Sequence, residues 1–74
     1  MNFITVTSIG GSIWSFRKDR IEMVTKKFSF TEEEMRSVPE LHGKESCAII
    51  RLIGENAKYF CRDTYESIME RLQQ

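Results

Sequence analysis

The longest apolar run of the chain is Cys47–Ile53, in which Arg51 is the only charged residue. A turn-rich segment, Gly54–Ala57, follows it, and the short aromatic segment Lys58–Cys61 comes next. Two apolar segments separated by such residues are typical of a β-hairpin. We therefore expect the second half of the chain to contain a hairpin on which the first half packs.

The expected pairing of this hairpin gives its first strand two apolar faces. If the turn closes Ile53 against Lys58, then Ile50 lies opposite Cys61, and successive side chains alternate between the faces. One face then carries Ala48, Ile50, Leu52, Tyr59 and Cys61. The other face carries Ile49, Ile53 and Phe60. A strand that is apolar on both sides is normally central in its sheet and covered on both sides.

An amphipathic helix is predicted near the end of the chain. Asp63 or Thr64 caps it, and Glu66, three residues after Asp63, forms a capping box. Its apolar residues recur at i, i+3, i+4 and i+7 as one stripe, which comprises Tyr65, Ile68, Met69 and Leu72. We expect this stripe to cover one face of the sheet, while the opposite side of the helix faces water with Arg62, Glu66, Glu70 and Arg71.

The first half of the chain predicts three more strands. Phe3–Thr7 is rich in aromatic and β-branched residues, Gly10–Gly11 accepts the positive φ angles of a tight turn, and Ile13–Phe16 returns as the second strand. After the polar connection Arg17–Arg20, an extended pattern resumes at Ile21 and runs to about Phe28, although its apolar residues alternate imperfectly.

Residues 29–46 predict an excursion from the sheet that contains a short helix. Thr31 and Glu34 form a capping box, in which the Thr31 hydroxyl accepts from a backbone N–H and Glu34 reaches back. Pro39 ends this helix near Ser37–Val38, because the residue before a proline is pushed out of the α region.

These elements predict a single α+β domain of 74 residues. It is a small, mostly antiparallel sheet, in the order β-β-β-short α-β-β-α, packed by the C-terminal helix. That helix covers one face of the sheet. The short helix Thr31–Ser37, a second copy of the chain or another protein covers the other, and the sequence leaves these alternatives open, homo-oligomer included.

Composition and charge exclude several classes of protein. The formal net charge is zero, so no global field favours nucleic acid or an anionic membrane. Residues 1–27 hold five basic and two acidic residues, whereas residues 28–46 hold two basic and five acidic ones. No apolar segment approaches the about 20 residues that cross a bilayer, and the N-terminus lacks the pattern of a signal peptide. We expect a cytoplasmic protein with no membrane partner and with Cys47 and Cys61 reduced.

Candidate catalytic groups are few, and we predict that the chain is not an enzyme. His42 lies beside a glycine in a polar loop, and both cysteines lie in apolar strands where a reactive thiolate is not expected. One His and two Cys without metal-binding spacing predict no metal site, and we expect no cofactor. The acidic run Glu32–Glu34 suits helix capping better than acid–base chemistry. Gly10–Gly11 lies within a hairpin, which excludes a P-loop.

An interaction role remains, with two candidate surfaces. The first is a protein-binding surface on the acidic insert, formed by Glu32, Glu33, Glu34, Met35 and Arg36, beside the basic hairpin. The second is a nucleic-acid surface, in which basic residues flank the rings of Trp14 and Phe16. Its basic residues are Arg17, Lys18, Arg20, Lys26 and Lys27. Because an isoelectric point near 6.6 is low for such a surface, the protein-binding reading is the main hypothesis.

Two blocks of the sequence share a characteristic order of strand and turn residues. The first comprises Ile4–Thr7, Gly11, Trp14, Phe16 and Asp19–Val24. The second comprises Ile49–Leu52, Gly54, Tyr59–Phe60 and Arg62–Ile68. Together they resemble the small β-rich proteins of the FlbD (swarming-motility) type, whose pattern lacks the insert from Phe28 to Ser46. The resemblance implies a non-enzymatic cytoplasmic accessory protein. The small size, the neutral charge and the lack of catalytic groups also suit a small regulatory or accessory protein of bacterial or phage type. The resemblance carries over no functional residue and no flagellar role.

Overall fold

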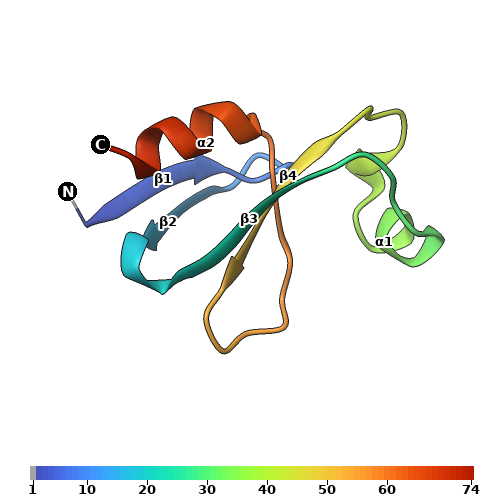
Figure 1. Ribbon diagram of the computed structural model, residues 1–74. Helices are drawn as coiled ribbons and strands as arrows, with labels where there is room; N and C mark the ends of the chain where they lie inside the picture. Colours follow the sequence, from blue (N-terminus) through green and yellow to red (C-terminus); the bar gives the residue numbers. More distant parts are fainter. Residues whose placement is uncertain (1) are drawn as a thin grey trace.

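The computed structural model describes residues 2–74, which form an α+β structure with two small antiparallel sheets (Figure 1). The first sheet pairs β1 (Phe3–Thr7) with β2 (Ile13–Arg17). The second holds β3 (Ile21–Lys27), β4 (Cys47–Leu52) and β5 (Tyr59–Cys61), with β4 in the centre. The helices are α1 (Glu32–Ser37) and α2 (Tyr65–Leu72), and the 3₁₀ turns are η1 (Lys18–Arg20) and η2 (Pro39–Leu41). The predicted fold class and element order are confirmed.

The single sheet expected from the sequence is divided in two, because η1 redirects the chain after β2 and β3 pairs with β4 instead. The sheets still meet at one corner, where Ser8 bridges Cys61. Backbone bonds from Ile9 N to Phe60 O (3.0 Å) and from Arg62 N to Thr7 O (2.8 Å) flank this bridge. The spatial order of the strands is therefore β2-β1-β5-β4-β3, which leaves β2 and β3 at the two outer ends.

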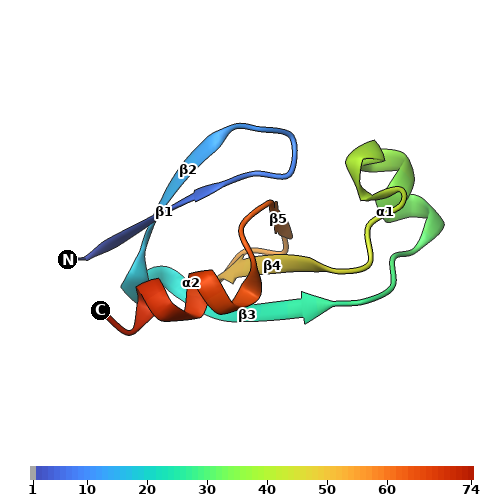
Figure 2. The same ribbon diagram turned by 90° about the horizontal axis from the view of Figure 1, so that it is seen from above.

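Helix α2 lies along β1 and β3 and packs on the space between the two sheets (Figure 2). Its Ile68 is completely buried, as is Ile50 in the middle of β4. The buried core around them also contains Ile4, Val6, Phe16, Ala48 and Cys61. Three residues of the predicted apolar stripe of α2 pack on this core, because Tyr65 and Leu72 join Ile68 there. Met69, the fourth, is partly buried.

Of the two predicted caps of α2, Thr64 is confirmed and Asp63 is not. Thr64 is the N-cap, and its hydroxyl accepts from the Ser67 N–H at 3.1 Å, so the capping box of Asp63 with Glu66 does not form. Asp63 instead accepts from the Thr7 N–H at 2.6 Å and pairs with Arg71 at 2.7 Å. Arg71, expected to face water, thus holds α2 against β1.

The register of the β4–β5 hairpin is also corrected. Ile50 lies opposite Tyr59 rather than Cys61, because the Ile53 N–H bonds to Arg20 O at 2.8 Å and so keeps Ile53 beside the start of β3. The loop is therefore longer than predicted, and Ile53 is 43% exposed instead of forming part of a packed face. The shift is two residues, an even number, so all side chains of the hairpin except Ile53 keep the faces predicted for them.

One turn and one strand in the first half differ in detail from the expected pattern. In the β1–β2 loop only Gly11 has a positive φ, of 102°, and the loop spans residues 8–12. In β3 the register shifts between Ile21 and Met23, which makes Glu22 an extra, bulged residue. This bulge explains why the apolar residues of β3 alternate imperfectly.

The insert between β3 and β4 covers the second face of β4 and projects at one end of the molecule (Figure 1). Ile49 and Phe60, both less than 10% exposed, pack there against Leu41 of η2, which is 1% exposed. The side chains of Phe30, Met35 and Val38 complete this second core. Of the alternatives left open by the sequence, the chain's own insert is the one that provides the cover.

The two-sided burial of β4 yields a stability prediction. Replacing Ile50 by Ala leaves a cavity under α2, and we expect it to lower the free energy of unfolding by about 2–5 kcal/mol. The matched control is Ile53→Ala in the same hairpin, where an exposed side chain is expected to cost no more than about 0.5 kcal/mol. Urea unfolding followed by circular dichroism measures both. Equal costs at the two positions would contradict the central position of β4.

Candidate functional site

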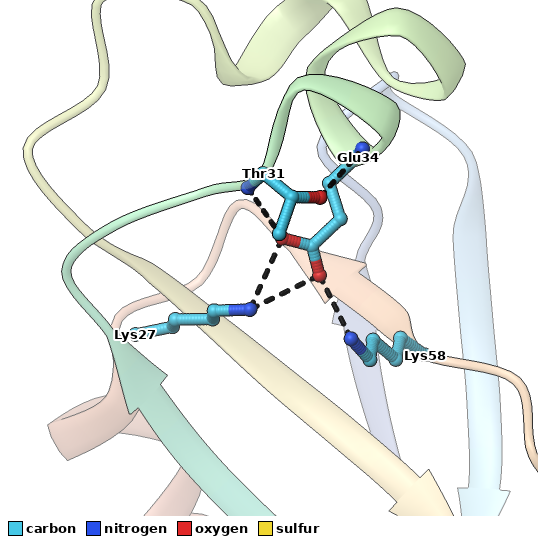
Figure 3. Close-up of polar contacts among 4 residues, drawn as sticks. All are labelled: Lys27, Thr31, Glu34 and Lys58. Atoms are coloured by element: carbon cyan, nitrogen blue, oxygen red, sulfur yellow. Dashed lines mark hydrogen bonds and ion pairs between the residues drawn. The ribbon is translucent and has the colours of Figure 1, made fainter.

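Glu34, one of the predicted partner-binding residues, is the ionic centre of the insert (Figure 3). Its carboxylate accepts from Lys27 Nζ at 3.0 Å and from Lys58 Nζ at 2.8 Å. It also accepts from the Thr31 N–H at 2.9 Å, while the Thr31 hydroxyl accepts from the Glu34 N–H at 3.0 Å, which confirms the predicted capping box. Glu34 therefore ties α1 to the end of β3 and to the start of β5.

The electrostatics of Glu34 follow from these contacts. Hydrogen bonds from Lys58 and Thr31, and then the charge and hydrogen bond of Lys27, lower the pKa of Glu34 from 4.5 to about 2 against the opposing effect of burial. The side chain of Glu34 is only 11% exposed. Its role in the structure is to hold the insert, which leaves little of it available to a partner.

The other predicted partner-binding residues divide into two groups. Met35 packs on the second core. Glu32, Glu33 and Arg36 are exposed, so they form the outer, solvent-facing surface of α1. His42, at the end of η2, is exposed as predicted.

The predicted nucleic-acid residues of η1 and its surroundings have partners within the chain. Arg17 pairs with Asp19 at 2.9 Å. Lys18 Nζ donates to Gln74 O at 2.7 Å. Arg20 donates to Ile53 O at 3.1 Å.

The two basic residues at the end of β3 are also engaged. Lys26 pairs with Glu66 at 3.0 Å, and Lys27 pairs with Glu34. The rings of Trp14 and Phe16 lie 5.3 and 5.1 Å from the ring of Tyr59 and pack towards the core. The structure therefore uses the cations for internal contacts and the rings for packing, and nucleic-acid binding stays a prediction that no specific contact favours.

The outer edge of β2 is a feature that the sequence analysis did not identify. Backbone bonds from Lys18 N to Asn2 O (2.8 Å) and from Ser8 N to Ser12 O (2.7 Å) flank the β1–β2 pair. Because hydrogen-bonded pairs alternate in an antiparallel ladder, Phe16 and Trp14 bond to β1. The intervening residues Ile13, Ser15 and Arg17 therefore direct their N–H and C=O groups outward.

The N–H and C=O groups of Ile13 and Ser15 and the N–H of Arg17 have no backbone hydrogen-bond partner within residues 2–74. The Arg17 C=O differs, because Arg17 is the N-cap of η1 and its carbonyl accepts the first bond of that turn, from the Arg20 N–H. Ile13 beside them is 67% exposed, and Ser15 and Arg17 are exposed as well. The strand pattern in the sequence predicts β2 itself. Only the tertiary arrangement shows that no other strand lies beside it.

The corresponding edges of the other strands are occupied or interrupted. On β1, Asp63 accepts from Thr7 N, and Arg71 and Arg62 donate to the carbonyls of Thr5 and Thr7. The edge of β5 is bonded at Ile9 and bridged at Ser8. The edge of β3 carries a bulge and lysines, two features that discourage a further strand from pairing.

Both cysteines are buried thiols without a disulfide, as predicted. Burial raises the pKa of Cys47, and burial together with the nearby Asp63 raises the pKa of Cys61 to about 12. The Cys47 thiol donates to Cys61 O at 3.4 Å, so the two residues are neighbours on adjacent strands but belong to opposite cores.

In the part of the chain that the structure describes, no three His, Cys, Asp or Glu side chains gather as metal ligands. No helix within residues 2–74 is long and apolar enough to cross a membrane.

Fold and surface together define a small α+β protein in which residues 2–74 form two cores and two outer strand edges, of which that of β2 is uninterrupted. Comparison of the chain with protein-family models, curated proteins and solved structures gives no match. The resemblance to FlbD-type proteins therefore stays a prediction, and the functional argument depends on the chain's own residues.

The low pKa of Glu34 predicts a pH-dependent stability. A carboxylate whose pKa is lowered on folding stabilises the native state above its unfolded value of 4.5, and this contribution is lost as the pH falls towards about 2. We expect Glu34→Gln to lower stability at pH 7 by about 1–2 kcal/mol and to flatten the decline between pH 5 and 2. The control is Glu33→Gln, on the exposed neighbour. Urea unfolding at several pH values in this range measures the free energy of unfolding. If that free energy falls between pH 5 and 2 as steeply for Glu34→Gln as for the wild-type protein, the role of Glu34 is contradicted.

The raised thiol pKa values predict chemical inertness. In the native protein at pH 8 we expect neither Cys47 nor Cys61 to react with a disulfide reagent such as DTNB, because the thiolate is the attacking species. Both are expected to react at once in urea, which serves as the internal control. Rapid labelling of the folded protein would show that one strand opens readily.

Proposed function

We propose that the chain is a non-enzymatic protein-interaction module that binds its partner by strand addition at β2. The observation that supports this most strongly is the outer edge of β2, where the N–H and C=O groups of Ile13 and Ser15 and the N–H of Arg17 point outward without a backbone partner, and where Ile13 is itself exposed. Exposed, unpaired strands are a template for another strand, and folded proteins usually interrupt or cover them. In this chain the other strand edges are interrupted or covered, and β2 is not.

The chemistry of strand addition fits the side chains of β2. In this mode the main-chain hydrogen bonds supply affinity, and alternate side chains supply specificity. Ile13, Ser15 and Arg17 offer an apolar, a small polar and a cationic position on the outer face. Trp14 and Phe16 border the core on the inner face.

The outer surface of α1 is a second contact region in this proposal. Glu32, Glu33 and Arg36 are exposed there, while Glu34 and Met35 fix the helix against the sheets. A helix held by two ion pairs and a core side chain loses little freedom when it binds, which favours its use as a recognition surface.

The non-enzymatic part of the proposal is supported by what the reactive groups do. The two thiols are buried with raised pKa values, and Glu34 is engaged with two lysines. Free thiols also suit a reducing compartment, so we propose a cytoplasmic regulatory or accessory protein.

The proposal is tested by affinity capture with matched variants. Ser15→Pro removes an outward N–H without removing a bond to β1, whereas Ser15→Ala keeps that N–H. We expect partners retained by the wild-type and Ser15→Ala proteins to be lost from Ser15→Pro. The double variant E32K/E33K reports on the surface of α1 in the same experiment. A partner retained equally by all four proteins would contradict both surfaces.

A further inference from the structure

The question that the β2 edge raises is which strand fills it. This inference rests on the proposed function and names the partner. The edge consists of Ile13–Arg17, and its only charge is Arg17 at one end. A strand with a charge at one end and an apolar residue at the other suits an antiparallel copy of itself, because the two ends then meet without charge repulsion.

We propose that the β2 edge is filled by β2 of a second copy of this chain, antiparallel to the first, with Ser15 on the two-fold axis. In this register Ser15 faces Ser15, and Ile13 faces Arg17 of the second copy. The two Ser15 residues exchange two backbone hydrogen bonds, and each Arg17 N–H donates to the Ile13 C=O that faces it. The N–H and C=O of Ser15, the C=O of Ile13 and the N–H of Arg17 are then paired on both chains, while the Arg17 C=O keeps its bond within η1.

Other registers leave part of this edge unpaired. Moving the axis to Trp14 pairs Ile13 with Ser15 and leaves Arg17 without a partner in β2. Placing the axis at Arg17 brings two like charges together, which is unfavourable between facing residues. The register centred on Ser15 is the one that gives each of Ile13, Ser15 and Arg17 a facing residue in β2 of the second copy.

The side chains on both faces are compatible with this register. On the outer face, the row that joins Thr5 and Ser15 through a 3.0 Å hydroxyl contact continues into the same row of the second copy. The exposed Ile13 comes to lie beside the aliphatic part of Arg17, whose neighbour on β1 is the exposed Phe3. On the inner face, Trp14 faces Phe16 of the second copy, which extends the aromatic cluster around Tyr59.

This geometry stops at two copies. A two-fold contact uses the same edge on both chains, so each β2 edge is consumed when the dimer forms. The opposite edge of β1 is occupied by Asp63, Arg62 and Arg71 and offers no further site of the same kind. The product is one four-stranded sheet, β1-β2-β2-β1, rather than a fibre.

The dimer is tested by sedimentation equilibrium of the purified protein at concentrations up to millimolar. We expect a monomer–dimer equilibrium that Ser15→Ala preserves and Ser15→Pro abolishes. Ile13→Lys, at a site that is 67% exposed, places a lysine opposite Arg17 and is expected to weaken the dimer roughly tenfold without unfolding the monomer. The double variant I13K/R17E sets opposite charges at the same contact and is expected to restore it.

Amide hydrogen exchange provides a residue-level readout. The amides of Trp14 and Phe16 bond to β1 and are expected to be protected at every concentration, whereas those of Ser15 and Arg17 gain protection only as the dimer forms. A protein that stays monomeric at all concentrations would overturn the inference. So would a dimer unaffected by Ser15→Pro, or one that I13K/R17E fails to restore.

The two proposals fail separately. A monomeric protein that still loses a captured partner on Ser15→Pro keeps the strand-addition function and refutes only the second copy as its occupant. A dimer through β2 with no other partner supports the second copy and confines the function to self-association.

Discussion

The structure depends on the burial of β4 from both sides. Ile50 is completely buried under α2, and Ile49 on the opposite face is 4% exposed under the insert. A chain of this size buries only part of its surface, so each of the two cores is small. Contacts outside the cores therefore help to hold α2 on one face of β4 and the insert on the other. The first cover is held by Asp63 and Arg71, which join α2 to β1. The second is held by Glu34 with Lys27 and Lys58.

This use of charge explains the uneven distribution along the chain. The excess of positive charge before residue 28 and of negative charge after it meets at the contact of Lys27 with Glu34. The Lys27–Glu34 pair is partly buried, and the same Glu34 carboxylate also completes the capping box of α1. Charged residues that in the sequence suggest a binding surface therefore mostly form contacts that position the insert and η1. Glu32, Glu33 and Arg36 remain exposed.

Backbone hydrogen bonding imposes the other constraint. A chain of five strands in the order β2-β1-β5-β4-β3 has two outer edges, and the two are treated differently. The edge of β3 has the bulged Glu22 and two lysines, whereas β2 has an uninterrupted, mostly apolar strand. This difference makes β2 the edge on which both the proposed strand addition and the proposed self-pairing depend.

Local chemistry in the sequence determined the elements: the alternation of Ile4 and Val6, the capping box of Thr31 with Glu34, and the stripe from Tyr65 to Leu72 all predict what is found. It also placed Ile49 and Ile50 on opposite faces, since a two-residue error in register does not change a face. Tertiary contacts decided the rest. The Ile53–Arg20 bond set the hairpin register, η1 divided the sheet, and Asp63 bonded to a strand 56 residues away instead of capping its own helix. Hydrogen-bond partners that are distant in the sequence compete with local ones, and the sequence pattern does not show which of them wins. Which strand edge stays unpaired depends on where every other strand of the structure lies.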